Sequence, residues 1–168
     1  LIIAHGWFMC KDSKAFMDMS ESFSKFYDII TFDFRGHGKS SGKYSFGKDE
    51  IKDLSAIVEF AKNKYSEIYL IGFSLGSLIS IDYCSKYSEI KKLITVSAPT
   101  DFNKIENNIF SPNAVIPILK KFEFKRWISV RFKLPFSKKT KPINVVDKIN
   151  IPIFFYCRRK RSDNKGMA

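Results

Sequence analysis

The stretch Gly72-Phe73-Ser74-Leu75-Gly76 decides how this chain folds. The apolar run 68–71 precedes it and is rich in residues that favour β-strands. Leu78, Ile79 and Tyr83 follow it at the spacing of one helix face. The pattern therefore predicts a strand, a sharp turn with serine at its apex, and then a helix.

A serine in such a turn is placed to act as a nucleophile. The turn lifts the serine oxygen above the sheet edge, and Gly72 and Gly76 let strand and helix approach without side-chain clashes. The helix N-terminus offers unpaired N–H groups to a developing anion. The alternative is a serine that only caps the helix and does no chemistry.

Length and composition indicate one globular domain. A chain of 168 residues is long enough to bury a core, and 45% apolar with 27% charged residues is ordinary for such a domain. No apolar run approaches the roughly 20 residues of a membrane span. The three cysteines have unrelated spacings, which favours free thiols in the reducing cytoplasm and gives no reason to expect a metal or another cofactor.

The net charge of +12 is concentrated in two segments. Residues 120–141 carry nine Lys or Arg against one Glu, and residues 158–168 carry five against one Asp. The rest of the chain is neutral overall. The sequence therefore predicts a balanced domain with two basic patches, and it contains no nucleic-acid recognition motif.

Apolar strands alternate with helical periodicity along the chain. Strands are predicted at 1–4, 28–34, 68–71, 93–98 and 151–156, and helices after the first three of them. Such an order indicates an α/β fold: a mainly parallel sheet, buried on both sides, with helices on both faces. Ligands in these sheets bind at the carboxyl ends of the strands. His5-Gly6, the loop 35–42 and Ser74 all lie at such ends and are expected to share one cleft.

Three segments resemble motifs of the α/β-hydrolase superfamily. They are His5-Gly6, Asp33-Phe34-Arg35-Gly36-His37-Gly38-Lys39-Ser40 and Gly72-Phe73-Ser74-Leu75-Gly76, in this order. The branch most similar is that of the serine aminopeptidases and monoacylglycerol-lipase-like proteins. The resemblance spans residues 1–156 and implies an incomplete fold that begins at the family's third strand and lacks the last strand and last helix.

The resemblance also implies roles for individual residues. Ser74 is the acylating nucleophile, and the backbone N–H groups of Trp7 and Leu75 form the oxyanion hole. A supporting loop is expected from His5, Gly6, Asp33, Arg35, Gly36, His37 and Gly38. Within that loop we expect Asp33 and Arg35 to pair with each other.

Residues 102–147 occupy the place where the family inserts a cap over the active site. In 120–141, aromatic and aliphatic side chains interleave with Lys and Arg. One interpretation is an amphipathic lid that meets an acyl chain or an anionic lipid surface. The other, which we favour, is a solvated lid helix with an apolar underside.

The catalytic triad is incomplete in this sequence. A serine hydrolase needs a histidine base and an acid that orients it. The family places the acid just after the strand at 151–156 and the histidine near the C-terminus. The chain has only two histidines, neither of them after His37. Asp163 lies two positions later than the acid should, so it is not assigned that role.

The tail 157–168 has the character of out-of-frame peptide. Reverse-translated with AGR arginine codons and read one base later, its first codons include Ala-Gly-Glu-Lys-Asp. That peptide contains a Gly-x-x-Asp at the family's spacing. We hypothesise that a frameshift near residue 157, in the gene or in its sequencing, replaced the acid and removed the histidine. Resequencing of the gene would test this.

The implied function is cleavage of a carboxylic ester or related acyl bond in a small-molecule substrate, through an acyl-enzyme at Ser74. The elbow does not separate esterase, thioesterase and peptidase activity. Without base and acid, this chain is expected to be almost inactive. The alternative from another class is a non-catalytic protein of the same fold that binds lipid or an anionic partner through its basic cap.

Overall fold

The computed structural model describes residues 1–99 and 142–157. Most of the predicted cap and nearly all of the predicted tail, including Asp163, lie outside the described residues. The predictions made for those two segments therefore stay predictions.

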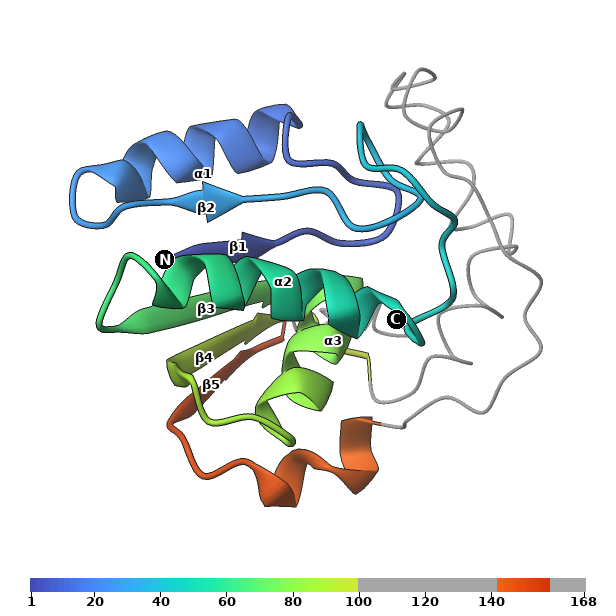
Figure 1. Ribbon diagram of the computed structural model, residues 1–168, viewed down its shortest axis with the longest axis vertical. Coiled ribbons are helices and arrows are strands. Elements are labelled where there is room, and N and C mark those ends of the chain that lie inside the picture. Colours follow the sequence, from blue (N-terminus) through green and yellow to red (C-terminus); the bar gives the residue numbers. More distant parts are fainter. Residues whose placement is uncertain (100–141, 158–168) are drawn as a thin grey trace, which may run out of the picture.

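Five strands form one parallel sheet in the order β2-β1-β3-β4-β5 (Figure 1). Their bounds are β1 Ile2–Ala4, β2 Ile30–Thr31, β3 Ile68–Phe73, β4 Ile90–Val96 and β5 Ile153–Tyr156. Ile3 of β1 lies opposite Thr31 on one side and Ile71 on the other. The predicted parallel α/β fold is confirmed, and the central strand β3 leads directly to Ser74.

Several strand boundaries differ from the prediction, and local contacts explain the early ends of β2 and β4. β2 was expected to continue to residue 34, but the Phe34 N–H donates instead to Nε2 of His5, at 3.0 Å. β4 was expected to begin at residue 93 and reach 98. It begins at Ile90 and ends at Val96, because Ser97 adopts a φ of 53° that the extended ladder does not accommodate.

Helices cover both faces of the sheet. α2 (Glu50–Lys62) and α3 (Leu75–Cys84) lie on the face seen in Figure 1. α1 (Lys14–Ser24) lies on the other face, where Phe16 makes an edge-on contact with Phe73, their ring centroids 5.2 Å apart. The short 3₁₀ turns η1 (Pro142–Asn144) and η2 (Val146–Lys148) precede β5.

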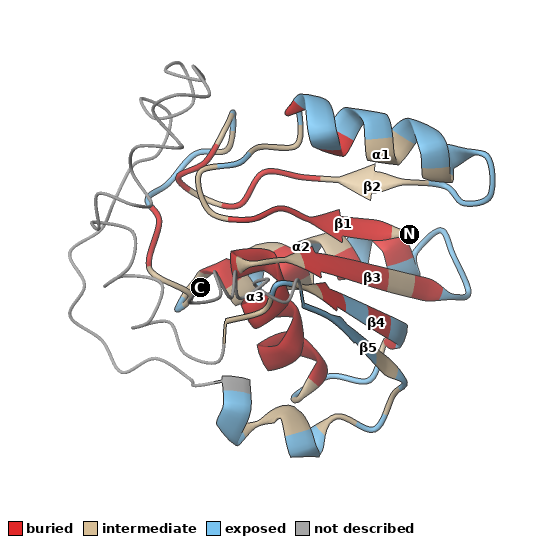
Figure 2. Ribbon diagram, turned by 180° about the vertical axis from the view of Figure 1, so that it is seen from behind, coloured by how far each residue is buried: buried red, intermediate tan, exposed pale blue. Residues whose placement is uncertain are grey.

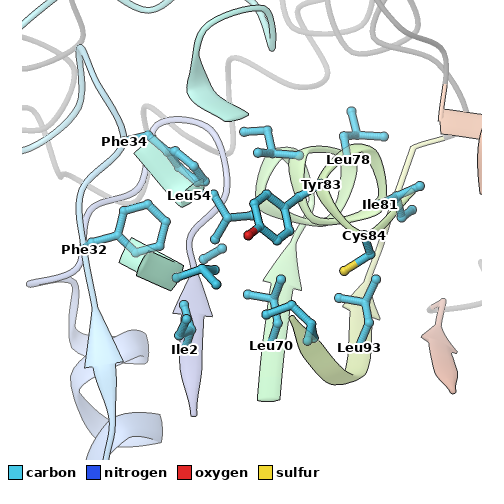
Figure 3. Packing of buried hydrophobic residues seen from close by; sticks show 14 of the residues in the cluster. Ile2, Phe32, Phe34, Leu54, Leu70, Leu78, Ile81, Tyr83, Cys84 and Leu93 are labelled. Carbon is cyan, nitrogen blue, oxygen red and sulfur yellow. The ribbon is translucent and has the colours of Figure 1, made fainter. Parts of the chain in front are cut away.

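The main core lies between the sheet and the helices α2 and α3. Its side chains come from the strands (Ile2, Leu70, Leu93), from the segment after β2 (Phe32, Phe34), from α2 (Leu54) and from α3 (Leu78, Ile81, Tyr83, Cys84), as Figure 3 shows. Truncating one buried Leu of this kind to Ala typically costs about 2–5 kcal/mol. This packing fixes α3, and with it the turn that carries Ser74, against the sheet.

The opposite face is covered only in part by the described residues. Seen from behind, β4 and β5 have no described helix in front of them (Figure 2). Ile94 and Phe154 are 36% and 62% exposed there, beside an apolar hollow of about 400 Å³ that Phe23, Tyr69 and Ile153 help to line. Among the described residues, the expectation that every strand is buried on both sides is therefore wrong for β4 and β5, whose Ile94 and Phe154 side chains are accessible on this face.

Candidate active site

Ser74 occupies a strained turn between β3 and α3. It follows Phe73, the last residue of β3, and precedes Leu75, the first residue of α3. Its φ of 49° and ψ of −107° lie outside the regions that residues with a side chain ordinarily adopt. Such a conformation costs on the order of 1–3 kcal/mol and persists only where the surroundings impose it.

The backbone of Ser74 is not that of an ordinary helix cap. A capping serine has extended dihedral angles and accepts a hydrogen bond from an amide of the first helical turn. Ser74 has neither the extended backbone nor a capping hydrogen bond from its side chain. Helix stabilisation therefore does not explain the serine at this position.

The elbow glycines are required by close backbone packing. A Cβ added to Gly72 would lie 2.7 Å from backbone atoms of Gly76 and from Cα of Ser77. A Cβ added to Gly76 would collide with the carbonyl oxygen of Ala4. The sharp approach of β3, α3 and β1 at this point therefore tolerates no side chain at either position.

The loop after β1 passes beside Ser74. A Cβ built on Gly6 would lie 3.4 Å from Cβ of Ser74 and 3.3 Å from the Phe73 carbonyl oxygen. Trp7 follows directly in this loop. Leu75 lies on the other side of Ser74, and as the first residue of α3 its N–H has no acceptor within the helix. The two residues expected to supply oxyanion donors thus follow directly on Gly6 and on Ser74.

Asp33 and Arg35 do not pair with each other, contrary to the prediction. The Asp33 carboxylate turns inward and accepts the backbone N–H groups of Lys11 at 2.7 Å and Lys39 at 3.0 Å. Arg35 reaches α2 instead, where its guanidinium contacts the Asp53 carboxylate at 2.6 Å. The two residues therefore make different contacts. Asp33 binds backbone N–H groups of the loops after β1 and β2, whereas Arg35 binds helix α2.

Two glycines of this loop have a positive φ, and Asp33 gives Gly38 a second reason to lack a side chain. Gly36 and Gly38 have φ values of 70° and 48°. A side chain on Gly38 would in addition overlap the Asp33 carboxylate. The Gly-His-Gly turn thus wraps closely around one buried acid.

His5 links the loops that follow β1 and β2. Its Nδ1 lies 2.7 Å from the Gly6 carbonyl oxygen, and its Nε2 accepts the Phe34 N–H. The neutral ring with a proton on Nδ1 satisfies both contacts. Burial lowers the pKa of His5, which favours this neutral form. Both ring nitrogens are therefore engaged within the scaffold.

His37 is buried beside His5. The ring centroids are 5.3 Å apart, and Nδ1 of His37 lies 3.2 Å from the Arg35 carbonyl oxygen. Burial, and then the neighbouring His5, lower the pKa of His37 to about 4. Neither histidine is placed to accept the proton of Ser74, since one has no free nitrogen and the other is enclosed in the loop that follows β2.

Glu50 is a supporting residue that the sequence did not single out. Its fully buried carboxylate accepts the Ser45 N–H at 2.6 Å, the Ser45 hydroxyl at 2.8 Å and the Gly47 N–H at 2.8 Å. Burial raises its pKa. The only available signal was an acidic cluster, Asp49, Glu50 and Asp53, directly after a glycine-containing loop.

The described residues place Ser74 in an elbow turn but do not supply the other two members of a triad. Among residues 1–99 and 142–157 there is no third histidine and no group of three metal-ligating side chains. β5 ends at Tyr156, whose carbonyl oxygen accepts the Ser97 N–H at 2.8 Å. The chain therefore leaves β5 at the carboxyl end of the sheet, the end at which Ser74 lies, and this is where the family resemblance places the acid.

A parallel α/β sheet with a strained serine at the turn after its central strand defines a class of protein, that built around a nucleophile elbow. Residues 1–126 match the family model for the alpha/beta hydrolase fold. The chain belongs to this family.

Two solved structures are similar over most of the chain. The Pyrococcus furiosus esterase Pf2001 is 30% identical with a TM-score of 0.69, over 92% of this chain and 59% of that one. A lipase-esterase related protein from Clostridium acetobutylicum ATCC 824 is 18% identical with a TM-score of 0.59, over 92% of this chain and 72% of that one. The second likeness shows the fold alone.

A curated relative is the uncharacterized protein RP471 of Rickettsia prowazekii (strain Madrid E). It is 31% identical over 96 residues, which are 55% of this chain and 39% of the relative. The chain thus spans well under two thirds of the length of both RP471 and Pf2001. Within the part of the chain that the structure describes, no helix has the length and apolar character needed to cross a bilayer.

Proposed function

We propose that this chain carries the nucleophile and oxyanion site of a serine hydrolase that cleaves a carboxylic ester. The observation that supports this most directly is the backbone of Ser74, with a φ of 49° at the strand–helix turn. Non-glycine residues in such conformations cluster at functional sites. The 30% identity to an esterase from Pyrococcus furiosus supports an ester as the substrate class.

The proposed chemistry begins with attack of Ser74 Oγ on the carbonyl carbon of the ester. The carbonyl π electrons move to oxygen, and the N–H groups of Leu75 and Trp7 stabilise that oxyanion. Each such donor contributes about 3–4 kcal/mol at the transition state. Collapse expels the alcohol, which takes the serine proton through a base, and water then releases the acid from Ser74.

The base in this scheme is a histidine that the 168 residues of this chain do not supply. His5 and His37 are buried and neutral, and their contacts belong to the loops that support the elbow. A triad that loses its base loses on the order of a millionfold in kcat. We therefore expect the chain of 168 residues to react very slowly on its own.

Fluorophosphonate labelling tests the proposal, because the reagent phosphonylates an activated serine. The chain is compared with a version whose reading frame is shifted after Tyr156. We expect labelling at Ser74 in the shifted version, and little in the chain itself. Ser74→Ala should abolish it, whereas Ser97→Ala should not, since Ser97 is an exposed serine with a φ of 53° that precedes no helix.

A folded shifted version that fails to label would contradict the proposal. It would favour the second candidate, a non-catalytic protein that binds lipid or an anionic partner through the basic residues 120–141. The observation behind this candidate is that neither histidine of the chain is available as a base. Binding to anionic vesicles that weakens steeply with salt and is unchanged by Ser74→Ala would support it.

A further inference from the structure

The hydroxyl of Ser77 lies between the ends of two strands. Ser77 is fully buried in the first turn of α3. Its Oγ donates to the Gly72 carbonyl oxygen at 2.6 Å and accepts the Val96 N–H at 3.1 Å. Gly72 belongs to β3 and Val96 is the last residue of β4. One side chain of the helix therefore bridges the two strands directly below the elbow.

The same two strand ends hold the backbone of Ser74. The Ser74 N–H donates to the Val96 carbonyl oxygen at 2.9 Å. Val96 thus receives a hydrogen bond from Ser74 through its carbonyl and gives one to Ser77 through its amide. Gly72 and Ser77 lie two residues before and three residues after Ser74. These hydrogen bonds together form a circuit that ties the turn around Ser74 to the end of β4.

This circuit explains how a strained residue is held. Relaxation of Ser74 toward ordinary dihedral angles would move its N–H away from Val96 and turn the first residues of α3. Ser77 resists that movement, because its hydroxyl ties the first turn of α3 to both strands at once. A buried polar group that loses its partner costs on the order of 1–3 kcal/mol, comparable with the strain at Ser74.

We propose that Ser77 is a positioning residue for the nucleophile: its hydroxyl imposes the elbow conformation of Ser74 by joining Gly72 and Val96. The functional part of this inference rests on the proposed hydrolase activity, whereas the structural part does not. Ser77 would act through Ser74 and would not contact the substrate.

The experiment compares Ser77→Ala with Ser80→Ala in the full chain. Ser80 is the matched control, because it is also a fully buried serine of α3. Its Oγ donates to the Gly76 carbonyl oxygen at 2.6 Å, within the same helix. Both variants lose one buried hydroxyl, but only Ser77→Ala disconnects the strands. Amide hydrogen exchange and the backbone carbon chemical shifts of Ser74 are measured by NMR.

We expect Ser77→Ala to raise the exchange rates of the Ser74 and Val96 amides about tenfold beyond any change at Leu70, a core amide of β3. The Ser74 shifts should move toward ordinary values in Ser77→Ala and stay unchanged in Ser80→Ala. Equal effects of the two variants would overturn the inference. If Ser77→Ala does not fold, Ser77→Cys, with a weaker donor of similar size, gives the same comparison.

Labelling separates this inference from the proposed function. In the frame-shifted version, Ser77→Ala should slow fluorophosphonate labelling at Ser74 about tenfold or more, while Ser80→Ala leaves it unchanged. If amide exchange depends on Ser77 but the protein never labels, the positioning role of Ser77 stands and the proposed hydrolase activity is rejected. Normal labelling of Ser77→Ala would reject the positioning role and retain the hydrolase.

Discussion

At the scale of single residues, burial decides what the two histidines do. Both lie beneath the loops that support Ser74, and each ring is held by backbone groups of those loops. Their position next to glycine at the ends of strands is compatible with catalysis, but the family resemblance predicts a supporting role for both. The sequence does not show how deeply each imidazole ring is buried or where its nitrogens point. These two properties place both histidines in the scaffold.

The buried His37 predicts a loss of stability in acid. Its pKa is about 4 in the folded protein and near 6.5 in the unfolded chain, so the unfolded state binds more protons between these values. Stability should therefore fall as the pH drops from about 6.5 to about 4, by on the order of 3 kcal/mol from His37 alone.

Urea unfolding of the wild type and of His37→Asn at several pH values measures this effect. Asn retains a donor for the Arg35 carbonyl but does not titrate. The difference between the two unfolding free energies should shrink as the pH falls through this window, because His37→Asn loses less stability in acid. The neighbouring His5, Asp33 and Asp53 stay the same in both proteins. A difference that does not vary with pH would contradict the assignment.

At the scale of elements, Arg35 joins the loop after β2 to helix α2. Its Nε and Nη2 atoms reach the Asp53 carboxylate, and its backbone N–H donates to the same group at 2.9 Å. Asp49, in the turn before α2, lies 3.9 Å from another guanidinium nitrogen. The loop that carries His37 is thus anchored to a helix, and that anchor depends on a planar guanidinium.

Arg35→Lys should therefore destabilise the protein by about 1–3 kcal/mol, because an ammonium group cannot replace the two-pronged contact with Asp53. Lys14→Ala is the control. Lys14 pairs with Asp18 on exposed α1, with side chains 85% and 59% accessible. Its loss should leave the stability nearly unchanged, because solvent screens an exposed ion pair. Thermal unfolding of both variants distinguishes them, and equal losses would show that the Arg35 contact has no special weight.

The order of strands and helices was predictable from the sequence, because apolar runs and helical spacing persist over whole elements. So was the elbow turn, since Gly72, Ser74 and Gly76 stand between an apolar run and a stretch with helical spacing. The strand ends were not predictable: β2 stops where His5 takes the Phe34 amide, a contact across 29 residues. The partner of Arg35 was not predictable either, because several acids lie within reach along the chain.

At the scale of the whole molecule, the sheet is asymmetric among the described residues. Its α2–α3 face is packed, whereas Ile94 and Phe154 remain accessible on the other face over β4 and β5. Among the described strands, β5 also lies at one edge of the sheet, where an exposed strand is a template for pairing with another chain. Apolar surface next to an open edge favours self-association of the isolated chain.

Phe154→Lys should reduce concentration-dependent aggregation of this chain without lowering its melting temperature by more than a degree or two. Phe154 is 62% exposed, so its replacement removes little buried surface. Phe60→Lys is the matched control, since Phe60 is 49% exposed on α2 and away from the open face. Light scattering over a range of protein concentrations gives the comparison. Equal aggregation of both variants and the wild type would show that the open face does not drive association.

The pairing of β1 with β3 sets the order of events during synthesis. Ile3 lies opposite Ile71, so an apolar strand made early must wait for a partner made much later. At about 5–20 residues per second on the ribosome, that wait lasts several seconds. Only then can the elbow form, because Gly76 packs against the backbone of β1. The nascent chain therefore carries β1 without its β3 partner for seconds before Ser74 acquires its geometry, an interval in which a chaperone could bind the exposed apolar segments.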